Sequence, residues 1–304
     1  MKQISTFERI ISNRNTLGFL FMLPAAVLLI GLLAYPLGLG TWLGFTDAKI
    51  GREGVWIGIE NFKFLITDSV FTLAVFNTLV YTIVASIAKF LIGLWLAILL
   101  NKNLPYQSFF RAIVLLPWIV PTALSAIAFW WIYDSQFSVV SWGLQKLGLI
   151  DTYIDFLGDP VMARISTIIA NVWRGIPFVA ISLLAGLQTI SPSYYEAASI
   201  DGATAWQQFR HITLPLLSPI IAVVMTFSVL FTFTDFQLIY VLTRGGPLNA
   251  THLMATLAFQ RAIPGGSLGE GAAIATMMVP LLLAAIMFSY FGLQRRAWQQ
   301  GADR

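Results

Sequence analysis

The stretch EAASIDGATAWQQFRHITLP, residues 196–215, lies between two long apolar segments of the chain. It has the residue pattern of two short helices joined by a turn. Gly202 suits the turn, because glycine adopts a left-handed backbone without a steric penalty. Pro215 is expected to end the second helix, because proline lacks a backbone N–H and clashes with the preceding turn. The connection over 191–215 is therefore predicted to be ordered.

Both short helices have a start signal. Ser193 and Glu196 fit a capping box, in which the hydroxyl caps the helix and the carboxylate reaches back, and Thr204 and Gln207 repeat the pattern. A hairpin of this kind could lie on lipid headgroups, which Trp206 would suit. Its alanine- and glycine-rich half instead offers a smooth surface for packing against another protein. The residues alone leave both interpretations open.

The composition of the whole chain is that of a membrane protein. Of its 304 residues 58% are hydrophobic and 11% are charged, and the mean hydropathy is +0.78. About 20 apolar residues make a helix that crosses a bilayer, and these stretches are too long and uniform for barrel strands. We predict one all-α transmembrane domain over 1–304. Its six expected spans are about 17–45, 72–100, 110–133, 163–190, 216–243 and 271–293.

The basic residues predict an orientation. Lys2 and Arg9 precede the first span, and the 101–111 loop has two basic residues and no acidic one, whereas the 134–162 loop is rich in aspartate. The positive-inside rule then places both termini and the 191–215 connection in the cytoplasm. The first apolar run is longer than the core of a signal peptide, so it is expected to remain as a span.

Several function classes lack sequence support. The formal charge of +4 follows from the loop distribution and does not indicate a nucleic-acid binder. The chain has no cysteine, and His211 and His252 are isolated, so neither thiol chemistry nor a metal site is expected. It has no paired carboxylates or nucleophile motif that would indicate an enzyme, and no phosphate-binding loop. No cofactor is expected on this chain.

The 191–215 connection resembles a known motif. The spacing of Glu196-Ala197-Ala198, Gly202, Ile212 and Leu214-Pro215 is similar to the EAA motif of bacterial ABC import permeases. The resemblance continues in NVWRGIPF at 171–178 and in DFQLIYVLTRGGP at 235–247, where Arg244 replaces the small residue of many relatives. The pattern is similar to the carbohydrate permeases of the maltose and glycerol-phosphate type, F-like member. The coupling residues it implies are Glu196, Ala197, Ala198, Asp201, Gly202, Ala203, Ile212, Leu214 and Pro215.

This resemblance implies a set of partners. The EAA helix of such permeases docks on a cytoplasmic ATPase, and stiff capped helices would transmit the motion of that subunit. The chain is accordingly expected to pair with a second permease and two ABC ATPases in the bacterial inner membrane. ATP and Mg²⁺ would bind to the ATPases. An extracytoplasmic binding protein would deliver a carbohydrate, which would cross by alternating access.

Three ionisable residues, Lys89, Arg174 and Asp235, fall within predicted spans. Each costs several kcal/mol at the bilayer centre unless it is paired or wet, so each is a functional candidate. Arg174 and Asp235 are expected at a similar depth, roughly 12–17 Å from the outer surface. They either line a polar cavity or pair with each other, and both could hold. Lys89 is expected to contact a neighbouring helix or subunit.

A sugar site would add aromatic faces and hydroxyl partners near these charges. Trp173, Phe178 and Phe236 are placed to supply such faces. The resemblance to the permease family, whose substrate site falls on the fourth and fifth spans, implies Gly175, Phe178, Thr234, Asp235 and Gln237. The candidate substrate-pathway residues are therefore Trp173, Arg174, Gly175, Phe178, Thr234, Asp235, Phe236 and Gln237. Two alternatives stay open. One is ABC import of glycerol phosphate or another polyol. The other is an ion-coupled secondary transporter that uses Asp235 as its coupling carboxylate.

Overall fold

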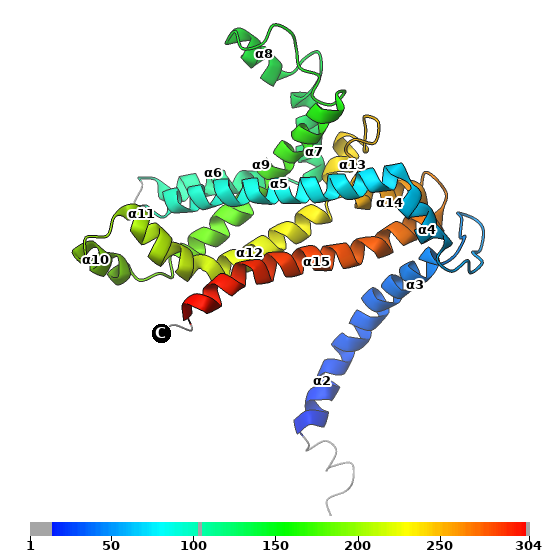
Figure 1. The fold of residues 1–304 in the computed structure, drawn as a ribbon, viewed down its shortest axis with the longest axis horizontal. Helices are drawn as coiled ribbons and strands as arrows, with labels where there is room; N and C mark the ends of the chain where they lie inside the picture. Colours follow the sequence, from blue (N-terminus) through cyan, green and yellow to red (C-terminus); the bar gives the residue numbers. More distant parts are fainter. Residues whose placement is uncertain (1–13, 103–104, 302–304) are drawn as a thin grey trace, which may run out of the picture.

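The computed structural model describes residues 14–102 and 105–301 and is nearly all helical (Figure 1). Lys2 and Arg9, on which the predicted orientation partly rests, lie outside the described residues. The helices are α2 Arg14–Leu29, η1 Ile30–Ala34, α3 Tyr35–Gly44, α4 Glu60–Thr67, α5 Ser69–Leu100, α6 Gln107–Ile119, α7 Thr122–Ile132, α8 Val139–Lys146, α9 Pro160–Leu187, α10 Pro192–Ile200, α11 Ala205–Gln208, η2 Phe209–Thr213, α12 Leu214–Phe233, α13 Gln237–Leu242, α14 Met254–Ala262 and α15 Leu268–Gly301.

Five of the described helical segments are long and apolar enough to cross a membrane, and a sixth is possible if a bent pair counts as one span. The bent pair is α6 and α7, which meet at 92° where a single helix over 110–133 was expected. Pro121 explains the bend, because it cannot donate to a helix and disfavours helical geometry in the residue before it. Val120 is accordingly extended, with ψ 128°.

The core forms where α5, α9 and α12 pack together, and α15 lies along α12 (Figure 1). Leu183 and Leu217 are fully buried in it. Gly93 on α5 permits the close approach of α9, since a Cβ at this position would lie 2.7 Å from Cγ1 of Val179. The packing of these helices therefore depends on a missing side chain.

Replacing Gly93 with valine is expected to lower the free energy of unfolding by about 1–3 kcal/mol, because overpacking a close helix contact forces backbone shifts. Thermal unfolding of the purified protein in detergent measures the effect. Gly38→Val is the matched control, because a Cβ on Gly38 in α3 meets nothing within 4 Å. Equal losses in both variants would show that helix packing is not the cause.

Two segments project from this core (Figure 1). The span that begins at Asn15 has none of its most apolar window buried within the described chain, and only its end near Gly44 packs on α15. Around α8, Ser138 and Ser141 are fully buried whereas Phe137 is 79% exposed. Polar residues inside and apolar residues outside are typical of a surface that lipid or protein covers.

The helix–turn–helix predicted for 191–215 is present at one end of the bundle (Figure 1). Gly202 lies between α10 and α11 with a left-handed φ of 79°. The second capping box is confirmed: the Gln207 N–H donates to Thr204 Oγ1 at 3.4 Å, and the Thr204 N–H donates to Gln207 Oε1 at 2.7 Å. The turn and the second helix start are therefore as predicted.

The first predicted capping box is wrong. Ser191 is the cap of α10, and its Oγ accepts from the Ser193 N–H at 3.4 Å. Pro192 explains the earlier start, because it lies at the first position of the helix. A backbone N–H at that position has no partner within the helix, so proline loses no hydrogen bond there. Glu196 consequently lies within α10 and not at the position that reaches back to the cap.

Pro215 does not end the second helix as expected. The chain continues from α11 through η2 into α12, with Pro215 in the first turn of α12. The π-helical turn just before it changes the bonding pattern, and the Leu214 N–H donates to the Phe209 carbonyl. A wider turn accommodates proline without a break. The second half of the connection, from Ala205 on, is thus one continuous helical segment with the fifth span.

Candidate functional site

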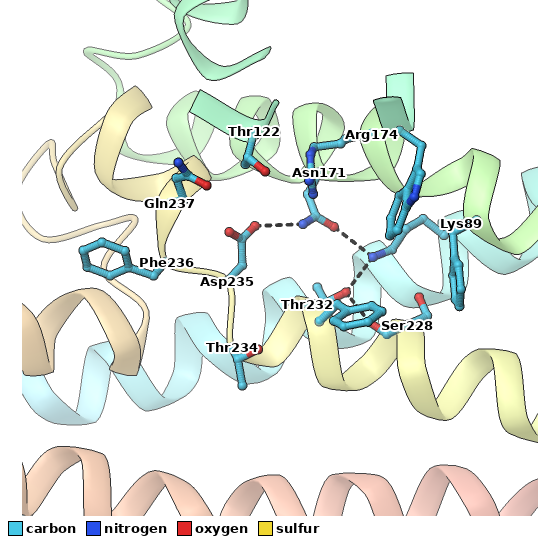
Figure 2. Close-up of a pocket in the computed structure, with 14 residues that line it drawn as sticks. Lys89, Thr122, Asn171, Arg174, Ser228, Thr232, Thr234, Asp235, Phe236 and Gln237 are labelled. Atoms are coloured by element: carbon cyan, nitrogen blue, oxygen red, sulfur yellow. Dashed lines mark hydrogen bonds between the residues drawn. The ribbon is translucent and has the colours of Figure 1, made fainter. Parts of the chain in front are cut away.

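A cavity of about 460 Å³ lies between α5, α6, α9 and the junction of α12 with α13. Figure 2 shows the side chains that line it. All the candidate pathway residues except Trp173 face this one space: Arg174, Gly175, Phe178, Thr234, Asp235, Phe236 and Gln237. Candidate residues from the fourth and fifth spans therefore line one cavity, and its use as a substrate site stays a prediction.

The fifth span is interrupted at the cavity, although one helix over 216–243 was expected. Helix α12 ends at Phe233 and α13 begins at Gln237. Asp235 lies in the gap, and its Oδ1 accepts the Leu238 N–H at 3.3 Å. An aspartate that bonds to nearby backbone stabilises a helix start and competes with helix continuation. The break directs Asp235 and its neighbours toward the cavity.

Buried polar groups of three helices and the half-buried Asp235 form one hydrogen-bond network, part of which Figure 2 shows. Asp235 Oδ2 accepts from Tyr81 Oη at 2.7 Å and from Asn171 Nδ2 at 2.9 Å. Lys89 Nζ donates to Asn171 Oδ1 at 2.9 Å and to Thr232 Oγ1 at 2.5 Å. The expected contact of Lys89 with a neighbouring helix is confirmed. Tyr81, Asn171 and Thr232 were not among the predicted site residues.

Arg174 and Asp235 line the same cavity but do not form an ion pair with each other within the described part of the chain. The guanidinium of Arg174 instead lies over the Trp118 ring, 5.6 Å from its centroid. Trp118 stacks on Phe178 with centroids 5.3 Å apart, and Phe231 meets Phe178 edge-on. These rings form an aromatic wall beside the charges, and sequence reasoning missed Trp118 and Phe231.

Trp173 points away from the cavity. Its ring packs edge-on against Phe129 at 5.3 Å, and 41% of the side chain is exposed. Helix periodicity explains the difference, since positions i, i+3, i+4 and i+7 share one face. Asn171, Arg174, Gly175 and Phe178 follow that spacing and Trp173 does not. The same periodicity could have added Asn171 to the predicted site and removed Trp173.

The two histidines have structural contacts, and the described residues contain no group of side chains suited to hold a metal ion. His252 is buried and lies 3.1 Å from Thr256 Oγ1 through its Nδ1. His211 Nδ1 lies 3.0 Å from the Gln207 carbonyl in the preceding turn. Neither residue faces the cavity.

The predicted coupling residues lie at the opposite end of the fold from α4 and α14 (Figure 1). A shallow surface hollow of about 360 Å³ lies there, between α10 and η2. The coupling candidates that line it are Ala198, Asp201, Gly202, Ala203 and Ile212. Small residues (Ala198, Gly202 and Ala203) and longer ones (Gln207, Gln208, His211 and Ile212) share this lining, and docking on it stays a prediction.

Ionisable side chains that face a cavity between membrane-length helices mark a substrate or ion pathway, as in a multi-pass transport permease. Residues 89–299 match the family described as "Binding-protein-dependent transport system inner membrane component". The chain belongs to this family of inner-membrane transport components. Its permease fold, predicted from the EAA spacing, is confirmed.

Individual relatives are similar over nearly their whole length. The trehalose/maltose transport system permease protein MalF of Thermococcus litoralis is 35% identical over 283 residues, which cover 92% of this chain and 95% of the relative. A bacterial ABC transporter involved in the import of the acidic polysaccharide alginate contains a chain with a TM-score of 0.81 and 25% identity, covering 96% and 99% of the two chains. The same type of transporter, solved with an alginate pentasaccharide-bound periplasmic protein, gives a TM-score of 0.80 at 25% identity, covering 93% and 96%.

Proposed function

We propose that this chain is a permease subunit of an ATP-driven importer that moves a carbohydrate into the cytoplasm by alternating access. The observation that carries the proposal is the cavity, where an aromatic wall faces hydrogen-bonding side chains at a broken helix. Apolar walls with a few convergent polar groups are typical of small-molecule sites. The trehalose/maltose and alginate relatives support a sugar as the molecule that is moved.

The proposed complex needs further subunits. A second permease would close the open side of the cavity, and two ABC ATPases would hydrolyse ATP, since this chain has no phosphate-binding loop. The hollow between α10 and η2 would receive one ATPase, and this end of the bundle would then face the cytoplasm, the side that the positive-inside rule also predicts. A periplasmic binding protein would deliver the sugar at the other end, as its presence in the alginate transporter complex suggests.

Uptake of labelled sugars into proteoliposomes that contain the complete complex tests this function. Uptake should require ATP on the side of the membrane where the ATPase subunits lie. It should persist when ionophores abolish proton and sodium gradients. Accumulation that follows an ion gradient without ATP would instead identify a secondary transporter. ATP-driven uptake of substrates other than sugars would contradict the carbohydrate assignment alone.

A further inference from the structure

The cavity has two chemically different ends (Figure 2). Thr234, Asp235 and Gln237 lie at one end, around the break between α12 and α13. Lys89, Arg174 and Ser228 lie toward the other, and the aromatic wall runs beside them. All three of these side chains can donate hydrogen bonds, and two of them are cationic.

Some hydrogen-bond donors at this second end have no acceptor among the described residues. Arg174 Nε is buried and has no hydrogen-bond partner among the described residues, and neither does the Ser228 hydroxyl. Ser228 is only 3% exposed. Lys89 has three ammonium hydrogens and donates two hydrogen bonds, to Asn171 and Thr232. Buried donors without partners are costly. Thr82, Ser86, Arg111 and Ser125 also have such atoms, but of this set only Arg174 and Ser228 line the cavity, where a ligand would supply the acceptor.

Among the described residues, Asp235 is the one carboxylate that lines the cavity, and its hydrogen bonds go to other groups. Asp235 Oδ2 accepts from Tyr81 and Asn171, and Oδ1 accepts from the Leu238 backbone. Two cationic side chains therefore face the cavity with one acidic side chain, which is already bonded elsewhere. Charges within a membrane need a partner, and the missing charge is negative.

We infer that the transported sugar has an anionic group, a carboxylate, sulfonate or phosphate, which binds Lys89, Arg174 and Ser228. The inference rests on the proposed function and narrows its substrate class. Arg174 suits such a group, because a guanidinium binds oxyanions through paired hydrogen bonds while it stacks on an aromatic ring. The sugar ring would lie against Trp118 and Phe178, beside the anion-binding end.

Matched sugar pairs test the inference in proteoliposomes with the complete complex and one binding protein throughout. Each pair compares an acidic sugar with its neutral counterpart. The first pair is a glucuronate-containing disaccharide and the corresponding glucose disaccharide. A phosphorylated hexose and a sulfonated hexose are each compared with the parent hexose. ATP-driven uptake should favour an acidic member. Arg174→Gln should raise its KM about tenfold, the effect of losing a charge-assisted hydrogen bond, and change the KM of the neutral member by less than about twofold.

Three further variants complete the design. Arg174→Lys keeps the charge and should retain the preference for the acidic sugar. Ser228→Ala should weaken acidic uptake selectively, which allows the test even if Arg174→Gln assembles poorly. Lys146→Gln is the charge-matched control, because Lys146 is exposed on α8 and does not line the cavity.

ATP-driven uptake of neutral members alone, or an equal effect of Arg174→Gln on both members of a pair, would overturn the anionic substrate and leave the sugar importer intact. Absence of ATP-driven uptake for every sugar would count against the importer and the anionic substrate together. Selective loss of acidic uptake in both Arg174→Gln and Ser228→Ala is the supporting result.

Discussion

Replacing Asp235 with alanine is expected to lower ATP-driven uptake at least about tenfold, the effect of about 1.4 kcal/mol on a transport barrier. The carboxylate accepts hydrogen bonds from Tyr81 and Asn171, on two different helices. Without it, these donors lose their acceptor at a cost of about 1–3 kcal/mol each, and no other acidic side chain of the described residues lines the cavity with Lys89 and Arg174. The measurement is initial uptake rate in proteoliposomes, with complex assembly checked by size-exclusion chromatography.

Two variants separate the role of this carboxylate from a general effect of removing an acidic residue. Asp235→Asn keeps one acceptor oxygen and the side-chain shape, so it should retain more uptake than Asp235→Ala. Asp151→Ala removes an exposed carboxylate in the loop before α9 and should leave uptake unchanged. An uptake rate and KM of Asp235→Ala equal to those of the unmodified complex would remove Asp235 from the site.

The spans could be predicted from hydropathy because a bilayer requires about 20 apolar residues in a helix. Their ends could not, because local caps set them. The fourth span was predicted to begin at residue 163, yet α9 begins at Pro160. Asp159 Oδ1 accepts the Val161 and Met162 N–H groups at 2.9 and 2.8 Å, which extends the helix beyond the apolar run. The hydropathy of a stretch contains no information about such a cap.

The site was predictable in part for a similar reason. Ionisable residues within apolar runs are rare enough to identify Lys89, Arg174 and Asp235 as candidates. Their partners carry no such signal, since Tyr81 and Asn171 are ordinary residues of a membrane helix. Tyr81 reaches Asp235 from a position 154 residues earlier, and only tertiary packing brings the two together. The break at Asp235 likewise depends on bonds made in the folded chain.

Replacing Gly202 with tryptophan is expected to lower uptake at least about tenfold while the ATPase subunits continue to hydrolyse ATP, because about 1.4 kcal/mol of lost coupling suffices. Gly202 forms the turn between α10 and α11, and a Cβ there would meet nothing within 4 Å. The indole would project from the surface proposed to dock on the ATPase and would not disturb the membrane fold. Parallel assays of ATP hydrolysis and sugar uptake in the same proteoliposomes measure the loss of coupling.

Gly51 provides a close control for the Gly202 variant, because tryptophan at either position carries the same backbone strain. Gly51 has a φ of 77° against 79° for Gly202, and a Cβ on either residue meets nothing within 4 Å. A non-glycine residue in this conformation costs about 1–2 kcal/mol, so strain alone should affect both variants equally. Gly51 lies far from α10, so Gly51→Trp should preserve coupling. Asparagine tolerates the left-handed conformation and is smaller than tryptophan, so Gly202→Asn should preserve most of the coupling. Coupled uptake in Gly202→Trp, or equal losses in Gly51→Trp, would contradict a docking role for the turn.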